Sequence, residues 1–122
     1  MRIIQSLGAL NIPMDYQAYI EKYIQNVSKI PFISKVILFG SCAREMITEH
    51  SDIDIFIITN REISEDEEML VTFNCLPEYS IDTIPIDILV QSERAFADYM
   101  NSYGMVQQQV NKYGVDISGL LR

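Results

Sequence analysis

Three aspartates in this sequence have spacings that could hold divalent metal ions. Asp52 and Asp54 are separated by one residue, and Asp87 lies within a later apolar segment. Because side chains alternate between the two faces of a β-strand, Asp52 and Asp54 share one face and the isoleucines beside them occupy the other. Asp87 alternates with its own apolar neighbours in the same way. It can therefore join the pair if the two strands lie side by side.

The chemistry that suits such a group is metal binding. Carboxylates brought together repel one another, and an unpaired charge in an apolar strand is costly, so cations are needed to stabilise them. Magnesium prefers hard oxygen ligands and is commonly held by a few carboxylates and substrate phosphates. Two such ions, held about 3.5–4 Å apart, can activate an attacking hydroxyl and stabilise a departing oxygen. We therefore predict Asp52, Asp54 and Asp87 as catalytic ligands of two Mg²⁺ ions.

A glycine-serine pair supplies a complementary phosphate site. Gly40 and Ser41 follow an apolar run that ends at Phe39. Glycine lets the backbone approach a ligand closely, and the free N–H groups of a helix N-terminus bind phosphate. Ser41 is predicted to cap a short helix over residues 42–47, and Arg44 would project near the same side. This arrangement predicts a bound nucleoside triphosphate and nucleotidyl transfer with pyrophosphate leaving.

Each of these features also has a plainer interpretation. The aspartate pair could be solvated at a strand start, and Asp87 or Arg44 could form an ordinary ion pair. The glycine-serine pair alone is most often a simple turn. His50 is interpreted as a solvated loop residue, and Cys42 as a small packed thiol. The metal and phosphate interpretation is favoured because the aspartates and the turn occur together.

The elements that must position these residues follow from the apolar pattern. Residues 15–30 are predicted as a scaffolding helix with one buried stripe, ended by Pro31. Strands are predicted over residues 35–39, 52–59 and 84–90, and Pro85 indicates a strand start or a sheet edge. A helix capped by Ser64 and Glu67 runs towards Leu76. Ser92 caps another helix, whose apolar stripe reaches Tyr103 and restarts after Gly104 towards Tyr113. The fold class is α/β (α+β), a small mixed β-sheet flanked by helices.

Composition limits the classes of partner. With 122 residues, 48% of them hydrophobic, residues 1–122 are expected to form a single domain. The motifs above make this a nucleotidyltransferase domain. A net charge of -8 repels nucleic acid, although bound cations can reverse the sign locally. Two cysteines are too few for a disulfide framework, which favours a reducing, cytoplasmic location. No apolar run approaches the roughly 20 residues that span a bilayer, so we expect no membrane partner.

The order of these motifs resembles the DNA polymerase beta nucleotidyltransferase superfamily. The similarity rests on Leu38-Phe39-Gly40-Ser41, then Ser51-Asp52-Ile53-Asp54, and then Ile86-Asp87-Ile88. The chain looks most like the minimal nucleotidyltransferases, the antitoxin partners of HEPN toxins. The resemblance implies a polymerase beta-type fold in which Gly40 and Ser41 hold phosphates and the aspartates ligate metal. It also implies transfer of AMP from ATP to a tyrosine hydroxyl of a HEPN toxin, which inactivates that toxin.

The sequence departs from the family pattern at Cys42 and Glu45. Many relatives carry a glycine where Glu45 stands, and its carboxylate adds negative charge close to the expected phosphates. Two other functions therefore stay open. The chain could modify a small molecule such as an aminoglycoside, with the site completed in a homo-oligomer, or it could be a catalytically silent antitoxin that acts by binding. Few residues follow Asp87, so we expect the acceptor to be bound by a partner protein or a second subunit.

Overall fold

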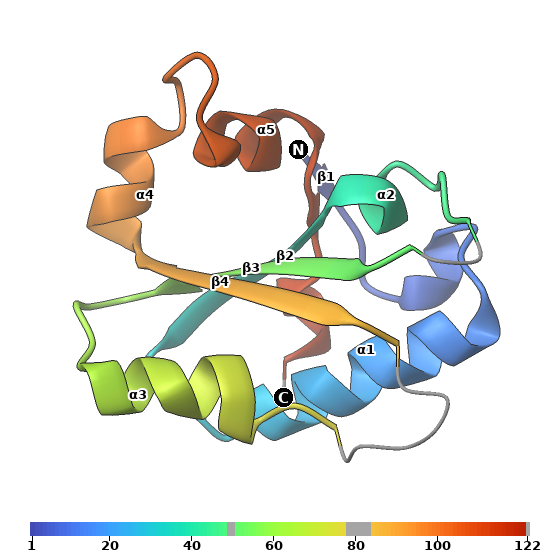
Figure 1. Ribbon diagram of the computed structural model, residues 1–122, viewed down its shortest axis with the longest axis horizontal. Helices are drawn as coiled ribbons and strands as arrows, with labels where there is room; N and C mark the ends of the chain where they lie inside the picture. Colours follow the sequence, from blue (N-terminus) through green and yellow to red (C-terminus); the bar gives the residue numbers. More distant parts are fainter. Residues whose placement is uncertain (49–50, 78–83, 122) are drawn as a thin grey trace.

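The structure is a computed structural model that describes residues 1–48, 51–77 and 84–121. Within those residues, five strands form one mixed sheet in the order β1-β5-β2-β3-β4 (Figure 1). The pairs β1–β5 and β3–β4 are parallel, and β2 runs antiparallel to both β3 and β5. The strands are β1 (Arg2–Ile3), β2 (Ile33–Phe39), β3 (Ile53–Thr59), β4 (Ile86–Ser92) and β5 (Val115–Asp116).

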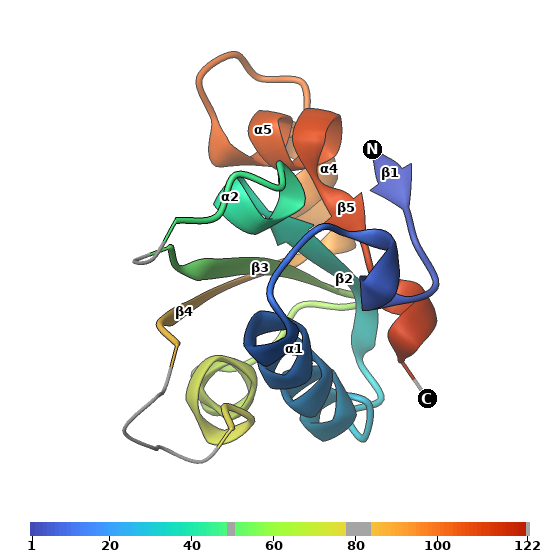
Figure 2. The ribbon, with the colours of Figure 1, turned by 90° about the vertical axis from the view of Figure 1, so that its right-hand side faces the viewer.

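Helices cover both faces of this sheet, as Figures 1 and 2 show. One face carries α1 and α3, and the other carries α4 and α5, with α2 beside the end of β2. The α-helices are α1 (Met14–Val27), α2 (Gly40–Ala43), α3 (Glu65–Met69), α4 (Glu93–Tyr99) and α5 (Val106–Tyr113). A π-helical turn, η2 (Leu70–Asn74), continues α3, and two 3₁₀ turns are η1 (Leu7–Ala9) and η3 (Ser118–Leu120). No helix of the described part is long and apolar enough to cross a membrane.

Strand β3 divides the core between the two faces. Ile53, Ile55 and Ile57 are buried in the cluster that includes α1. Phe56 and Ile58 belong to a second cluster with residues of α4 and α5. This alternation is the strand periodicity predicted from the sequence, and it places Asp54 on the face of Phe56 and Ile58. The predicted small mixed sheet flanked by helices is confirmed.

Two helix caps were predicted correctly. The Ser64 hydroxyl accepts a hydrogen bond from the Glu67 amide at 3.2 Å, and the Glu67 carboxylate accepts one from the Ser64 amide at 3.0 Å. The Ser92 hydroxyl accepts from the Ala95 amide at 3.2 Å and so caps α4. Pro85 precedes β4, and β4 is an edge strand, as its proline predicted.

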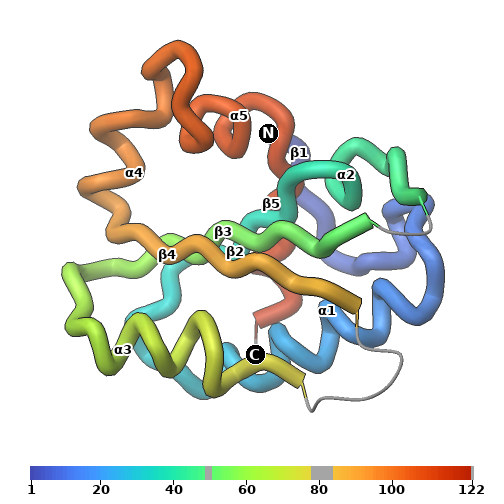
Figure 3. The backbone as a smooth tube through the Cα atoms, in the orientation of Figure 1, coloured from blue at the N-terminus to red at the C-terminus, as the bar shows by residue number. Residues whose placement is uncertain are grey.

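Other boundaries differ from the prediction. Helix α1 ends at Val27, three residues before the predicted end at 30. Helix α4 ends at Tyr99, and the chain then loops away from the sheet before α5, as the tube in Figure 3 shows. Tyr103 is 97% exposed, so the predicted apolar stripe through it is wrong. Strands β1 and β5 were not predicted, because two residues are too few to show a period.

Candidate functional site

Asp54 and Asp87 lie opposite each other on adjacent parallel strands. The register of β3 and β4 makes them Cα partners, and Asp54 also pairs with Phe39 at the end of β2. Residues in register on neighbouring strands point to the same face, so the two carboxylates share one side of the sheet. Asp54 is half-buried, whereas Asp87 and Asp52, which immediately precedes β3, are exposed. The strand adjacency expected from the sequence is therefore present.

The electrostatics of Asp54 reflect this crowding. Burial raises the pKa of the Asp54 carboxyl, and the nearby charges of Asp87 and Asp52 raise it further. Each of these influences disfavours the ionised form. A cation beside the three carboxylates would reverse the second influence and favour ionisation.

Gly40 leaves space for the Asp54 carboxylate. It is the first residue of α2 and has a φ of 70°, a conformation that glycine adopts without steric cost. A Cβ atom on Gly40 would overlap the Oδ2 atom of Asp54. The end of β2, the start of α2 and the middle of the aspartate cluster are therefore in direct contact.

The turn after Gly40 differs from its prediction. Helix α2 begins at Gly40 and ends at Ala43, and its N-cap is Phe39, without a side-chain capping bond. The predicted role of Ser41 as N-cap is therefore wrong, as is the helix over 42–47. The helix starts earlier than expected, at Gly40, which places Ser41 inside it, and it ends early because Glu45 has a left-handed φ of 57°. Ser41 lies in the first turn of α2 and is half-buried.

Glu45 is paired with Arg2 at the edge of this turn. Its Oε1 lies 3.1 Å from Nη1 of Arg2, and both side chains are partly exposed. The residue thus occupies a backbone conformation that glycine adopts more easily, in line with the glycine that many relatives carry there. Its charge, which the sequence suggested would oppose phosphate binding, has a cationic neighbour.

Arg44 points towards α5. Its guanidinium donates a hydrogen bond to Oε1 of Gln109 at 3.3 Å and lies 4.8 Å from the ring centroid of Tyr113. Arg44 is exposed, so its charge is available to a ligand placed between α2 and α5. Among the residues that the structure describes, its guanidinium contacts an amide and a ring and forms no ion pair with a carboxylate, which the alternative interpretation expected.

Two side chains hold the backbone next to Asp52. The Tyr16 hydroxyl donates to the carbonyl oxygen of Ser51 at 2.7 Å, and the Cys42 sulfur lies 3.6 Å from the carbonyl oxygen of Asp52. Burial, followed by the charges of Asp54 and Asp52, raises the pKa of the Cys42 thiol to about 12. Cys42 is fully buried, which confirms the prediction of a packed thiol.

Sequence reasoning missed this role of Tyr16, which it counted only as part of a buried stripe. Tyr16 is 7% exposed, and burial, followed by the electrostatic influence of Cys42, Asp15 and Asp52, raises its pKa. A signal was present in the residue type. A buried tyrosine, unlike leucine, needs an acceptor for its hydroxyl, so it fixes a second segment of the chain.

The donor set fits a hard divalent cation, although the side chains are not gathered around one. Among residues 1–48, 51–77 and 84–121, no three histidine, cysteine or acidic side chains form a compact metal-binding group. Asp52, Asp54 and Asp87 nevertheless offer only oxygen ligands, and burial, followed by the charges of Asp87 and Asp52, raises the pKa of Asp54. Oxygen ligands of this kind suit Mg²⁺. The interpretation of His50 concerns a residue outside the described ranges.

Comparison with known proteins decides the family. A family model for "Polymerase beta, Nucleotidyltransferase" matches residues 19–119. The chain belongs to the polymerase beta nucleotidyltransferase family. This match includes the C-terminal part of α1, the aspartate strands and both C-terminal helices, and it confirms the superfamily indicated by the sequence motifs. No curated protein matches the chain at a significant level.

A solved structure supports the same nucleotidyltransferase fold. The chain is similar to a provisionally assigned nucleotidyltransferase from Sulfolobus solfataricus, known from a crystal structure at 1.40 Å resolution. The two share 20% sequence identity and a TM-score of 0.51, and the similarity covers 77% of each chain. At this identity the similarity establishes the fold. The nucleotidyltransferase fold generally uses a nucleoside triphosphate and a divalent metal.

Proposed function

We propose that this nucleotidyltransferase is magnesium-dependent and transfers AMP from ATP, with Asp52, Asp54 and Asp87 as its catalytic metal ligands. The observation that carries the proposal is the register of Asp54 with Asp87, together with the contact of Gly40 against Asp54. This arrangement places the aspartates, which can bind cations, next to the start of α2, where phosphate can approach the backbone. When bound, two Mg²⁺ ions would supply Lewis-acid stabilisation of the phosphates and the leaving oxygen.

The protein groups have separate tasks in this reaction. The backbone at Gly40 and the hydroxyl of Ser41 receive the triphosphate, and the exposed Arg44 guanidinium supplies positive charge beside it. The acceptor oxygen forms a bond to the α-phosphorus of ATP, the bond to the bridging oxygen breaks, and pyrophosphate leaves. The Asp87 carboxylate, exposed at the edge of the sheet, accepts the proton of the acceptor hydroxyl.

The acceptor in this proposal is a protein, and specifically a tyrosine hydroxyl of a HEPN-type toxin that the chain inactivates as its antitoxin. Two observations support it. The order of motifs resembles the minimal nucleotidyltransferases, and the Asp87 carboxylate is exposed on the face of the sheet that it shares with Asp54, where a large acceptor can reach it. The pairing of Glu45 with Arg2 also reduces the electrostatic objection to phosphate binding near this turn.

The first experiment measures ATP binding by calorimetry, with and without magnesium. The proposal expects binding that requires Mg²⁺ and is lost in the Asp52→Ala/Asp54→Ala variant. A matched control is Glu65→Ala/Asp66→Ala, which removes two exposed carboxylates from α3 and should leave binding intact. Absence of binding at millimolar ATP would overturn the enzymatic proposal.

A second experiment tests the acceptor. A HEPN protein co-expressed with the chain should gain the mass of AMP on tyrosine, as measured by intact-mass and peptide mass spectrometry, and the Asp52→Ala variant should abolish the gain. Protection of cells from that toxin by the Asp52→Ala variant would instead indicate a silent antitoxin. Transfer of AMP to an aminoglycoside, with none to the HEPN protein, would indicate a small-molecule enzyme.

A further inference from the structure

The outer edge of β4 has free backbone hydrogen-bonding groups. Alternate residues of a parallel strand bond to a given neighbour. The Ile53 amide donates to the Pro85 carbonyl at 2.8 Å, so Pro85, Asp87, Leu89 and Gln91 direct their backbone groups towards β3. The residues between them, including Ile88 and Val90, direct theirs outwards. Among the described residues, no strand pairs with this edge.

This edge has one charged residue, Asp87, and lacks the other features that usually protect an exposed strand. Edge strands are commonly blunted by shortness, by a bulge, or by lysine and proline within the strand. Strand β4 has seven residues, Ile86–Ser92, and its register with β3 contains no bulge. It contains no lysine or arginine, and its nearest proline precedes it. The opposite edge strand, β1, has only two residues.

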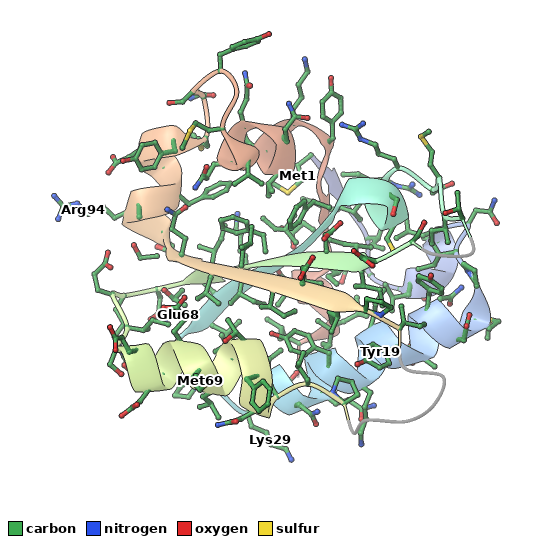
Figure 4. The ribbon with its side chains drawn as sticks, in the orientation of Figure 1. Met1, Tyr19, Lys29, Glu68, Met69 and Arg94 are labelled. Atoms are coloured by element: carbon green, nitrogen blue, oxygen red, sulfur yellow. The ribbon has the colours of Figure 1, made fainter. Side chains whose placement is uncertain are left out.

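Exposed apolar side chains flank the edge on both faces of the sheet. Leu89 of β4 is 42% exposed, and Val106 of α5 is exposed near it. On the α3 side, Met69 and Phe73 are 55% and 66% exposed, and Figure 4 shows Met69 on α3, below β4. A cavity of about 220 Å³ along the edge is lined by residues 88–91 of β4 and by Phe56, Glu68, Val106 and Gln107. The surface where another strand would lie therefore combines apolar side chains with the polar groups of Glu68, Gln91 and Gln107.

We propose that β4 pairs antiparallel with β4 of a second copy of this chain, with Leu89 at the two-fold axis, so that the two sheets become continuous. In an antiparallel pair, residues that exchange hydrogen bonds must both direct their backbone groups outwards. Pairing Ile88 with Val90 of the second copy, in both directions, satisfies this condition. Leu89 then faces Leu89, which is an apolar pair at the closest cross-strand position.

The charge of Asp87 favours this register over the two registers that are shifted by one residue. With Leu89 at the axis, Asp87 faces Gln91 of the second copy, a charged acceptor opposite an amide donor. Shifting the register so that Val90 lies at the axis would place Asp87 opposite Glu93, and like charges directly opposite are destabilising. The opposite shift places Asp87 against Leu89 and loses the amide. The sequence of β4 is thus self-complementary in one register.

The pairing would also place a hydrogen-bond donor from the second copy beside Asp87. The side-chain oxygen Oε1 of Gln91 accepts a hydrogen bond from Nε2 of Gln107 at 3.1 Å, which leaves the side-chain amide hydrogens of Gln91 available as donors. In the dimer those hydrogens lie beside Asp87 of the other copy. Each copy therefore contributes one amide next to the aspartate cluster of its partner.

The test places charges of either sign on Leu89, the residue at the proposed two-fold axis, and measures association. Sedimentation velocity should give the unmodified chain twice its monomer mass at high concentration, and added salt should strengthen association because each chain carries a net charge of -8. Leu89→Lys or Leu89→Glu places like charges at the axis, and each should weaken association on the order of 100-fold. Mixing the two variants should restore it. Met14→Lys, at an apolar residue 76% exposed on α1, is the control and should associate normally.

A second variant tests the backbone. Val90→Pro removes an outward N–H and no bond to β3, so it should abolish association while circular dichroism remains unchanged. A chain that is monomeric at all concentrations and salt levels would overturn the proposal. Normal association of Leu89→Lys and Val90→Pro, or failure of the Leu89 variants to associate when mixed, would also overturn it. None of these measurements depends on nucleotide transfer.

Discussion

Gly40 lies against Asp54, so closely that a single added methyl group would overlap the carboxylate. The contact couples the end of β2 to the centre of the aspartate cluster. It also gives Gly40 two separate reasons to be glycine, its φ of 70° and the absent Cβ atom.

Gly40→Ala should therefore lower transfer activity more than it lowers stability. The substitution costs about 1–2 kcal/mol for a left-handed alanine. It also displaces the Asp54 carboxylate, and a misplacement of this kind can reduce the rate on the order of 100-fold. Urea unfolding and steady-state transfer assays measure the two effects.

The matched control is Gly104→Ala. Gly104 has a φ of 83°, but a Cβ atom there would meet nothing within 4 Å. This variant should share the conformational cost and keep its activity. Equal loss of activity in both variants would show that backbone strain, rather than contact with Asp54, matters at Gly40.

Asp54→Asn should separate stability from activity. The pKa of Asp54 is raised by burial and by Asp87 and Asp52, so its charged form is less stable in the metal-free protein than that of an exposed aspartate. A neutral isostere removes that repulsion and should raise the midpoint of thermal unfolding. Loss of a metal ligand should lower transfer on the order of 1000-fold.

Magnesium provides the check on that variant. A ligand that binds only the folded state stabilises it. Magnesium should therefore raise the unfolding midpoint of the unmodified chain and leave Asp54→Asn almost unchanged in calorimetric scans. An equal rise in both proteins would place the metal elsewhere.

Tyr16→Phe should impair activity through the position of Asp52. The variant keeps the ring and removes the hydroxyl that holds the Ser51 carbonyl. We expect a stability loss of about 1 kcal/mol and an activity loss on the order of 10-fold, with a higher magnesium requirement.

Tyr23→Phe is the comparison for Tyr16→Phe. Tyr23 is buried on the same helix and donates to the Val71 carbonyl at 2.9 Å, on a segment that contributes none of the three aspartates. It should lose similar stability and retain the magnesium dependence of the unmodified chain. If Tyr16→Phe behaves the same way, its hydroxyl has a purely structural role.

Acid should weaken the capping box of α3. Hydrogen bonds from Arg61 and Ser64 lower the pKa of Glu67 to about 2 from an ordinary value of 4.5. A depressed carboxyl pKa stabilises the folded state above pH 4.5, and this contribution is lost as pH falls towards 2. The stability difference between the unmodified chain and Glu67→Gln should shrink over this window in urea titrations. A constant difference would contradict the pKa shift.

The sequence by itself determined the elements whose periods are long and regular. Alternation of Ile53, Ile55 and Ile57 with polar or aromatic neighbours predicted β3 and the face of Asp54, because strand geometry is set locally by the backbone. The capping residues Ser64 and Ser92 were also readable, since a cap bonds within its own turn. The order of the glycine-serine turn and the aspartates in the sequence was sufficient to indicate the family.

Only the tertiary structure decided relationships between distant segments. The register of Asp54 with Asp87, the contact of Gly40 with Asp54 and the bond from Tyr16 to Ser51 each join segments far apart in sequence, and no local propensity encodes such distances. Strands β1 and β5 exist only because they pair within the sheet. Glu45 ends α2 in a left-handed conformation stabilised in part by Arg2, and its residue type alone would have favoured continuing the helix.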